Sequence, residues 1–251
     1  MSSSIWTRSA GNSEIRRLAL EPWRVVEAQH RIATRKLVDS DAEQAVLEQL
    51  LDAHKPHVPA GGGLHYLLFT PFRYPPLRHG SRFGSRWEPG IWYGATTRRS
   101  AFAEVAYYRL LFLEGTEADL GLVETDLTAF RTTLRTSRGV DLTAAPFTAW
   151  RTSLASKTSY AETQPLGAAM REAGVEVVRY ESARDSAGGV NVAVFTPRPF
   201  GASRPRDLET WHSAASRGAV ELSKHDYFAP ASLRFPREDF LVDGALPRPD
   251  A

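Results

Sequence analysis

A short stretch between Gly80 and Tyr108 constrains the fold of this chain more than any other. It begins as a loop rich in glycine and arginine, continues as a short aromatic strand over residues 91–95, and ends in a helix that starts near Thr97 or Ser100. A hydroxyl residue at that point can accept a hydrogen bond from a free backbone N–H of the first helical turn. This order of elements favours an α+β fold, and we interpret the rest of the chain as its support.

One face of the predicted helix carries apolar residues at helical spacing. Four of them recur at i, i+4, i+7 and i+11, which predicts a single buried stripe. Glu104 lies beside that stripe rather than opposite it. The four residues are Ala101, Val105, Tyr108 and Phe112.

Arginine is concentrated around the same stretch. Between Phe72 and Arg99 there are six arginines and one acid, Glu88. A guanidinium binds phosphate bidentately and also stacks on rings, so arginines interleaved with aromatic residues suit a phosphorylated aromatic ligand. An ordinary basic surface loop explains the composition equally well. The arginines are Arg73, Arg78, Arg82, Arg86, Arg98 and Arg99.

Composition excludes several classes of protein. With 251 residues, 42% of them hydrophobic, the chain suffices for one large domain or two small ones. The absence of cysteine excludes disulfides, thiol catalysis and cysteine-based zinc sites. A net charge of +2 is too small to mark a dedicated nucleic-acid binder. No apolar run reaches the ~20 residues that cross a bilayer, and residues 1–13 lack the apolar core of a signal peptide, so we expect a cytoplasmic protein.

The first 60 residues predict an N-terminal helical appendage. Apolar residues at helical intervals follow Pro22, and residues 40–43 match a capping box that opens a second helix. A flexible joint at residues 59–63 separates this appendage from a predicted catalytic domain over residues 61–251. The first helix is indicated by Trp23, Val26, His30, Ala33 and Leu37, and the second by Val46, Leu47, Leu50 and Leu51.

The rest of the chain predicts strands interspersed with a few helices. Gly174 stands where a helix commonly ends. We expect strands at residues 64–70, 120–125, 130–136, 175–180, 191–196, 219–222 and 232–242, a helix over residues 160–173, and a short helix around Trp211.

Motifs for metal and nucleotide binding are missing from the sequence. The seven histidines are scattered, with no two spaced i, i+4 on a predicted helix and no HExxH motif, so we expect no metal site. Residues 61–63 lack the following Lys-Ser/Thr of a P-loop, and no GxGxxG motif opens a helix. No GxSxG motif supports a serine nucleophile.

Several separated segments form an ordered series. They are Phe72-Arg73, Gly80-Ser81-Arg82-Phe83, Tyr93-Gly94-Ala95, Ala101-Phe102-Ala103-Glu104, Glu181-Ser182-Ala183-Arg184 and the strand that contains Asn191. Together they resemble the RES domain, the toxin half of two-component toxin–antitoxin systems whose antitoxins carry an Xre-type helix-turn-helix. The resemblance covers residues 64–197. Ser81, Gly84 and Glu181 depart from the family pattern, and Glu181 brings a negative charge near the expected anion site.

The resemblance implies an ADP-ribosyltransferase-like core of antiparallel strands with flanking helices, and an enzyme that degrades NAD by hydrolysis or phosphorolysis. Departure of nicotinamide from the ribose passes through an oxocarbenium-like state, which a nearby carboxylate stabilises. The resemblance implies that Glu104 acts at the ribose and that Arg82, or Arg73 as a second candidate, holds the pyrophosphate. Tyr93 would stack on the nicotinamide or its ribose, and Ser182 would bind the nucleotide or support Glu104. Arg184 and Asn191 would be further NAD-binding residues.

The resemblance also implies partners. NAD is the expected substrate, with no metal and no additional cofactor. An Xre-type antitoxin would cover the Arg82 pocket, and nucleic acid would be met only through that antitoxin. No membrane is expected, and a homodimer is left open.

Three rival interpretations remain. The first is a protein ADP-ribosyltransferase that uses the same site. The second is a basic nucleic-acid-binding module without NAD turnover, and the third is a catalytically silent RES-like partner. The sequence leaves water, phosphate and protein open as acceptors of the ADP-ribosyl group.

Overall fold

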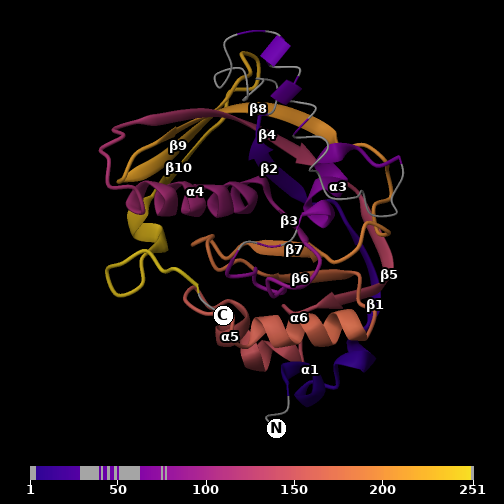
Figure 1. Ribbon diagram of the computed structural model, residues 1–251. Helices are drawn as coiled ribbons and strands as arrows, with labels where there is room; N and C mark the ends of the chain where they lie inside the picture. The colour runs from indigo at the N-terminus through magenta and orange to yellow at the C-terminus, as the bar shows by residue number, and fades with distance from the viewer. Residues whose placement is uncertain are drawn as a thin grey trace.

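The structure, a computed structural model, describes residues 4–28, 40, 42–43, 46–47, 50, 63–74, 76 and 78–249. Within them, ten strands form one sheet in the order β1-β5-β6-β7-β3-β2-β4-β8-β9-β10 (Figure 1). Neighbouring strands are antiparallel except for the parallel pair β5 and β6. The predicted α+β class is therefore confirmed, with a large mixed sheet and few helices.

The bounds of the elements are as follows. The strands are β1 Arg16–Leu20, β2 Trp23–Glu27, β3 Trp92–Ala95, β4 Val123–Arg131, β5 Leu134–Asp141, β6 Val177–Glu181, β7 Val190–Val194, β8 Arg206–Ala215, β9 Ala219–Lys224 and β10 Ser232–Pro236. The helices are α1 Ile5–Arg8, α3 Tyr66–Arg73, α4 Arg98–Glu114, α5 Arg151–Leu154 and α6 Thr163–Glu172, with 3-10 turns at Gly11–Glu14, Phe147–Trp150 and Arg237–Phe240.

The sheet is strongly curved, and α4 lies between its two halves (Figure 1). Buried side chains of α4 pack on β4, β8, β9 and β10, where the ring centroids of Phe102 and Trp211 are 4.7 Å apart. On the other half, α1 and α6 pack against one face of β5, β6 and β7, and α3 packs against the opposite face. Strands β6 and β7 are consequently buried on both faces, which suits their valine-rich sequences.

The start of α4 lies where the sequence predicts it. Thr97 is the N-cap, and its Oγ1 accepts a hydrogen bond from Ser100 N at 3.1 Å. The predicted buried stripe is wrong in position, because Tyr108 and Phe112 are 53% and 58% exposed. The buried apolar side chains of the helix are Ala101, Phe102, Ala103, Ala106, Tyr107, Leu110 and Leu113.

The predicted helix after Pro22 is wrong over residues 23–27. These residues form β2, which pairs with β3 on one side and with β4 on the other. The run Trp-Arg-Val-Val is rich in residues that favour strands, and two-sided pairing outweighs its weak helical periodicity. The remainder of that predicted helix lies outside the described residues. A separate helical appendage over residues 1–60 is not confirmed, because β1 and β2 belong to the common sheet.

The second predicted N-terminal helix is confirmed where the structure describes it. Residues 42–43, 46–47 and 50 are helical, and Glu43 N donates a hydrogen bond to Ser40 Oγ at 3.2 Å. Residues 51–62, which hold most of the predicted joint, are outside the described part.

Two further predictions are wrong in the type of element. Residues 64–70 were expected to form a strand, but α3 spans Tyr66–Arg73 and contains Pro71. The helix expected around Trp211 is part of β8, where alternate side chains are buried against α4. The predicted ranges for α6, β6, β7 and β9 overlap the observed ones closely, whereas β4 and β5 both begin later than predicted. Among the described helices, none combines the length and the apolar character needed to cross a membrane.

Candidate active site

A cavity of about 590 Å³ lies between α4 and the strands β2, β3 and β7. The residues that were expected to form the buried stripe of α4 line this cavity instead, which explains why two of them are exposed. Five of the predicted site residues also line it, namely Arg82, Tyr93, Glu104, Arg184 and Asn191. The fold therefore brings together groups that are spread over more than a hundred positions of the sequence.

Glu104 is held by two neutral donors. Its Oε1 accepts hydrogen bonds from Asn191 Nδ2 at 2.6 Å and from Ser182 Oγ at 3.0 Å. No ion pair joins Glu104 to any of the described residues, and neither hydrogen bond uses Oε2. The carboxylate is thus fixed in orientation, and no cationic side chain of the described residues forms an ion pair with it, which leaves it able to stabilise a positive charge in the cavity.

Ser182 supports Glu104 from behind rather than lining the cavity. Besides donating to Glu104, its Oγ accepts hydrogen bonds from the backbone N–H groups of Arg184 and Asp185, both at 3.1 Å. Asp185 in turn accepts from Ser100 Oγ, in the first turn of α4, at 2.7 Å. This network fastens the loop after β6 to the helix that carries Glu104. Of the two predicted roles of Ser182, the geometry favours support of Glu104.

Tyr93, on β3, anchors the arginine loop to the cavity wall. Its hydroxyl donates a hydrogen bond to Ser81 Oγ at 2.9 Å and accepts one from Phe83 N at 3.3 Å. Burial raises the pKa of Tyr93 to about 12, so the hydroxyl stays protonated at neutral pH. Its ring lines the cavity and is available for stacking.

Arg82 lines the cavity, but both of its terminal nitrogens donate hydrogen bonds to backbone carbonyl groups of the protein. Nη1 donates to Leu154 O and Nη2 donates to Ser156 O, both at 2.9 Å. The guanidinium also lies 5.2 Å from the ring centroid of Tyr160. Arg82 is therefore well placed to fix the segment after α5 against the cavity, and its predicted contact with a pyrophosphate remains a prediction.

One terminal nitrogen of Arg184 has no hydrogen-bond partner among the described residues. The side chain is buried, stacks over Tyr107 at 3.6 Å from the ring centroid, and donates from Nη2 to Lys157 O at 3.1 Å. Its Nη1 is buried without a hydrogen-bond partner among the described residues. A buried N–H of a cation without a partner is costly, so a bound anion at this point would satisfy it.

Arg24, on β2, is a cavity residue that the sequence analysis missed. Nη1 donates to Tyr93 O at 3.0 Å, the guanidinium lies 5.3 Å from the Trp92 ring centroid, and Nε has no partner among the described residues. Burial lowers the pKa of Arg24 to about 10, which leaves it charged at neutral pH. The sequence analysis placed Arg24 in a helical appendage and so did not consider it as a site residue. The strand-favouring residues around it were the signal that could have placed it in the sheet.

The remaining predicted positions lie away from the cavity. Arg73 ends α3, with its guanidinium 6.0 Å from the Tyr74 ring centroid, and does not line the cavity. Glu181, expected to bring negative charge near the anion site, forms an ion pair with Arg151 at 2.6 Å and does not line the cavity either. Among the described residues, four arginines and two glutamates line the cavity, and of these Arg109 and Glu27 form an ion pair at 2.7 Å.

This arrangement defines the class of site. The cavity has apolar and aromatic walls, buried cationic groups with an unused donor, and a fixed carboxylate, which together suit an anionic ligand that contains rings. A model of the RES domain family matches residues 56–214. Because the match covers more than half of the chain, this protein belongs to the RES domain family, which is known from toxin–antitoxin systems. No curated protein matches the chain closely.

Proposed function

We propose that this protein is a RES-type toxin that cleaves the N-glycosidic bond between nicotinamide and ribose in NAD, by hydrolysis or phosphorolysis. The observation that carries the proposal is the Glu104 carboxylate, which is fixed at the cavity by Asn191 and Ser182 without a cationic partner among the described residues. The proposal includes an ADP-ribosyltransferase-like binding mode for NAD, an Xre-type antitoxin that neutralises the toxin, and action in the cytoplasm.

The reaction needs a negative charge close to the ribose. As the bond from C1′ to nicotinamide breaks, its electron pair goes to the ring nitrogen, and positive charge develops on C1′ and on the ribose ring oxygen. The uncompensated carboxylate of Glu104 stabilises that charge. Water or phosphate then adds to C1′ on the ribose, and an attacking water loses its proton.

The rest of the cavity fits the remainder of NAD. Arg184 Nη1 and Arg24 Nε are the donors without partners among the described residues, so we assign them to the pyrophosphate, together with Arg82. The ring of Tyr93 offers a stacking surface for nicotinamide. A volume of about 590 Å³ is typical of a ligand cavity.

Transfer of ADP-ribose to a protein side chain is the second candidate. Tyr108 and Phe112 line the cavity and are half exposed, so a macromolecule could approach the reacting carbon there. A nucleic-acid-binding role is less well supported, because Arg98 and Arg99 form ion pairs with Glu209 and Asp185. Together with the buried Arg82, half of the arginines in the basic stretch are thus engaged within the protein.

The test is to incubate the purified protein with NAD, with and without phosphate, and to follow free nicotinamide together with ADP-ribose and its phosphorylated product. Glu104→Gln keeps the size of the side chain and removes its charge, and we expect it to reduce nicotinamide release by about 10²–10³-fold. The matched control is Glu117→Gln, at an exposed position after the same helix, which should retain full activity. Wild-type protein that releases no nicotinamide under any of these conditions would rule the proposal out, and label from NAD on a protein would favour the second candidate.

A further inference from the structure

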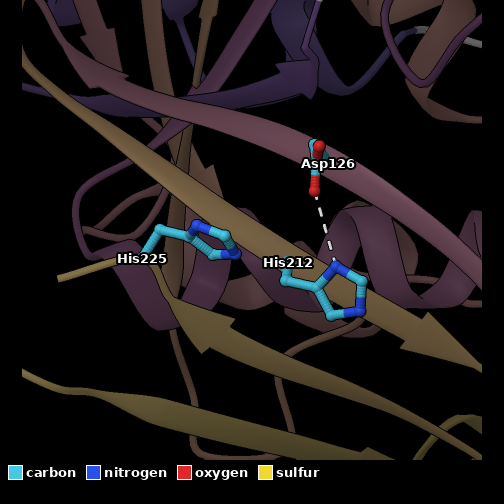
Figure 2. A group of neighbouring side chains, drawn as sticks. All are labelled: Asp126, His212 and His225. Carbon is cyan, nitrogen blue, oxygen red and sulfur yellow. Dashed lines mark hydrogen bonds and ion pairs between the residues drawn. The ribbon is translucent and has the colours of Figure 1, made fainter. Parts of the chain in front are cut away.

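Three side chains with metal-binding atoms meet on the face of the sheet opposite α4. Asp126 on β4 lies directly across from His212 on β8, and His225 follows the last residue of β9. Their neighbours in sequence, Leu127 and Trp211, are buried on the α4 face, so alternation along the strands places Asp126 and His212 on the other face. Figure 2 shows the three side chains gathered there.

The geometry of the three groups is close to that of a metal centre. One ligand atom from each of Asp126, His212 and His225 lies within 4.8 Å of the other two. His212 Nδ1 and Asp126 Oδ1 are 3.4 Å apart (Figure 2). Two ligands bound to zinc at ~2.1 Å with a tetrahedral angle are separated by about 3.4 Å. This pair therefore already has the spacing that the metal requires.

His225 is the ligand with room to adjust. Its backbone N–H donates to Thr210 O at 2.9 Å, which fixes the start of its side chain beside β8. The side chain itself is exposed, and its ring centroid is 6.3 Å from that of His212. An exposed side chain can change rotamer at little cost, so His225 is the ligand we expect to move when an ion binds.

We propose that Asp126, His212 and His225 bind a divalent transition-metal ion, of which Zn²⁺ is the best match. Two imidazoles and one carboxylate are ligands that zinc prefers, and three protein ligands leave one position of a tetrahedral centre for water. The sequence analysis predicted no metal site, because these ligands are brought together by pairing between strands rather than by spacing along one helix.

Glu124 supplies an independent indication. It lies 3.2 Å from the second nitrogen of the same imidazole, His212 Nε2, through its Oε1. A histidine that binds a metal commonly donates its other N–H to a carboxylate, which fixes the tautomer. With the Nε2 proton directed to Glu124, the Nδ1 lone pair faces Asp126, as a metal ligand requires. The two carboxylates also balance the charge of a divalent ion.

Lys224, the cationic residue next to His225 in the sequence, points away from the proposed metal ligands. Lys224 pairs in register with Trp211, so its side chain starts on the opposite face from His212. Its ammonium group forms ion pairs with Asp226 at 2.9 Å and with Glu209 at 3.4 Å. A bound ion would join β4, β8 and the residue that follows β9. It would lie on the opposite face of the sheet from Leu127, a residue that lines the proposed NAD cavity.

The test is a metal titration of the full chain, purified without a histidine tag and first freed of metal with a chelator. We expect Zn²⁺, measured in competition with a chromophoric chelator, to bind in one equivalent, and Co²⁺ to give the visible absorption of a tetrahedral ion. His225→Gln should weaken Zn²⁺ binding by more than about tenfold. The matched control is His79→Gln, another exposed histidine outside the cluster, which should bind Zn²⁺ as tightly as the wild type.

Both substitutions are at exposed positions, so thermal melting should show that each variant folds like the wild type. An Asp126→Asn variant provides a second test of Zn²⁺ affinity, since it removes the carboxylate charge and keeps the size of the side chain. Equal Zn²⁺ affinity in the wild type and in His225→Gln, or no binding by the wild type, would overturn the proposal and leave His212 as a simple ion-pair partner of its two carboxylates.

Discussion

Two carboxylates in different parts of the molecule are held in opposite ways. Asp141, at the end of β5, receives a hydrogen bond from Arg179 Nη1 at 2.7 Å and two from Thr143, and Arg16 lies 3.5 Å away. Glu104, at the cavity, receives hydrogen bonds only from neutral groups among the described residues. One carboxylate thus has cationic partners, whereas the other has none within ion-pair distance among the described residues.

We expect this difference to separate the structural role of Asp141 from the chemical role proposed for Glu104. Burial acts to raise the pKa of Asp141, but the hydrogen bonds from Thr143 and Arg179 outweigh it and bring that pKa below its usual value. The charge of Asp141 is therefore used to hold β5 to β6. Glu104 is fixed just as firmly by Asn191 and Ser182, yet its charge remains directed at the cavity. Substitutions at both places can test this distinction.

After Glu104→Gln, the largest effect is expected from Glu104→Asp, which keeps the charge and moves it by one methylene group. The shorter side chain cannot reach Asn191 and Ser182 from α4 while it also faces the cavity. A misplacement of this size costs about 10²-fold in rate, so kcat for NAD cleavage should fall by that factor. Near-normal kcat in a folded variant, as judged by thermal melting, would show that charge alone matters and that the two donors are incidental.

Removal of one donor should have a smaller effect. Asn191→Ala leaves the charge and length of Glu104 unchanged but frees the carboxylate on one side, so we expect kcat/KM to fall by about tenfold. Asn12→Ala, at an exposed position, is the matched control. Steady-state kinetics of nicotinamide release provide the measurement, and an unchanged kcat/KM in Asn191→Ala would contradict the positioning role.

Asp141→Asn should affect stability rather than chemistry. We expect a loss of about 1–2 kcal/mol in the free energy of unfolding at pH 7, because the hydrogen bonds to a charged group become neutral ones. The pKa of Asp141 is lowered by folding, so its contribution is present above the unfolded pKa of ~3.9 and is lost as the pH falls through the folded pKa. Denaturant unfolding of wild type and variant should therefore differ at pH 7 and converge in acid, while kcat stays unchanged.

The smallest effect is expected from Arg16→Ala. The Arg16 side chain is 47% exposed and meets Asp141 at 3.5 Å, and exposed pairs of this kind contribute about 0.5 kcal/mol or less. Urea unfolding at low and high salt would measure it. A loss larger than that from Asp141→Asn would show that Arg16 rather than Arg179 is the main partner of the carboxylate.

Local signals predicted those parts of the structure that local interactions determine. Thr97 begins α4 because its hydroxyl caps the first turn, and Gly174 follows α6 with a φ of +72°, a conformation that suits glycine. The family resemblance named Glu104, Ser182 and Asn191, and in the structure the latter two donate hydrogen bonds to Glu104. These residues could be found because short segments carry them.

What sequence reasoning missed depends on partners far away in the chain. Residues 23–27 contain strand-favouring residues, but they form a strand because two other strands pair with them, and neither partner can be identified from those five residues. Tyr108 and Phe112 have the spacing of buried residues, but the surface they face is a cavity. His212 and His225 come together through the register of β8 and β9, which a search for helical spacing cannot detect.

Strand β2 lies in the middle of the sheet and is translated long before the strands that pair with it. Arg24 leaves the ribosome early, but Trp23 pairs with Ala95 on one side and with Arg131 on the other. Asn191, which fixes Glu104, comes later still. Pairings between such distant residues form slowly, so a partly translated chain has no finished cavity. A product cut before Asn191 would therefore lack the side chain that fixes Glu104, however much of it accumulates.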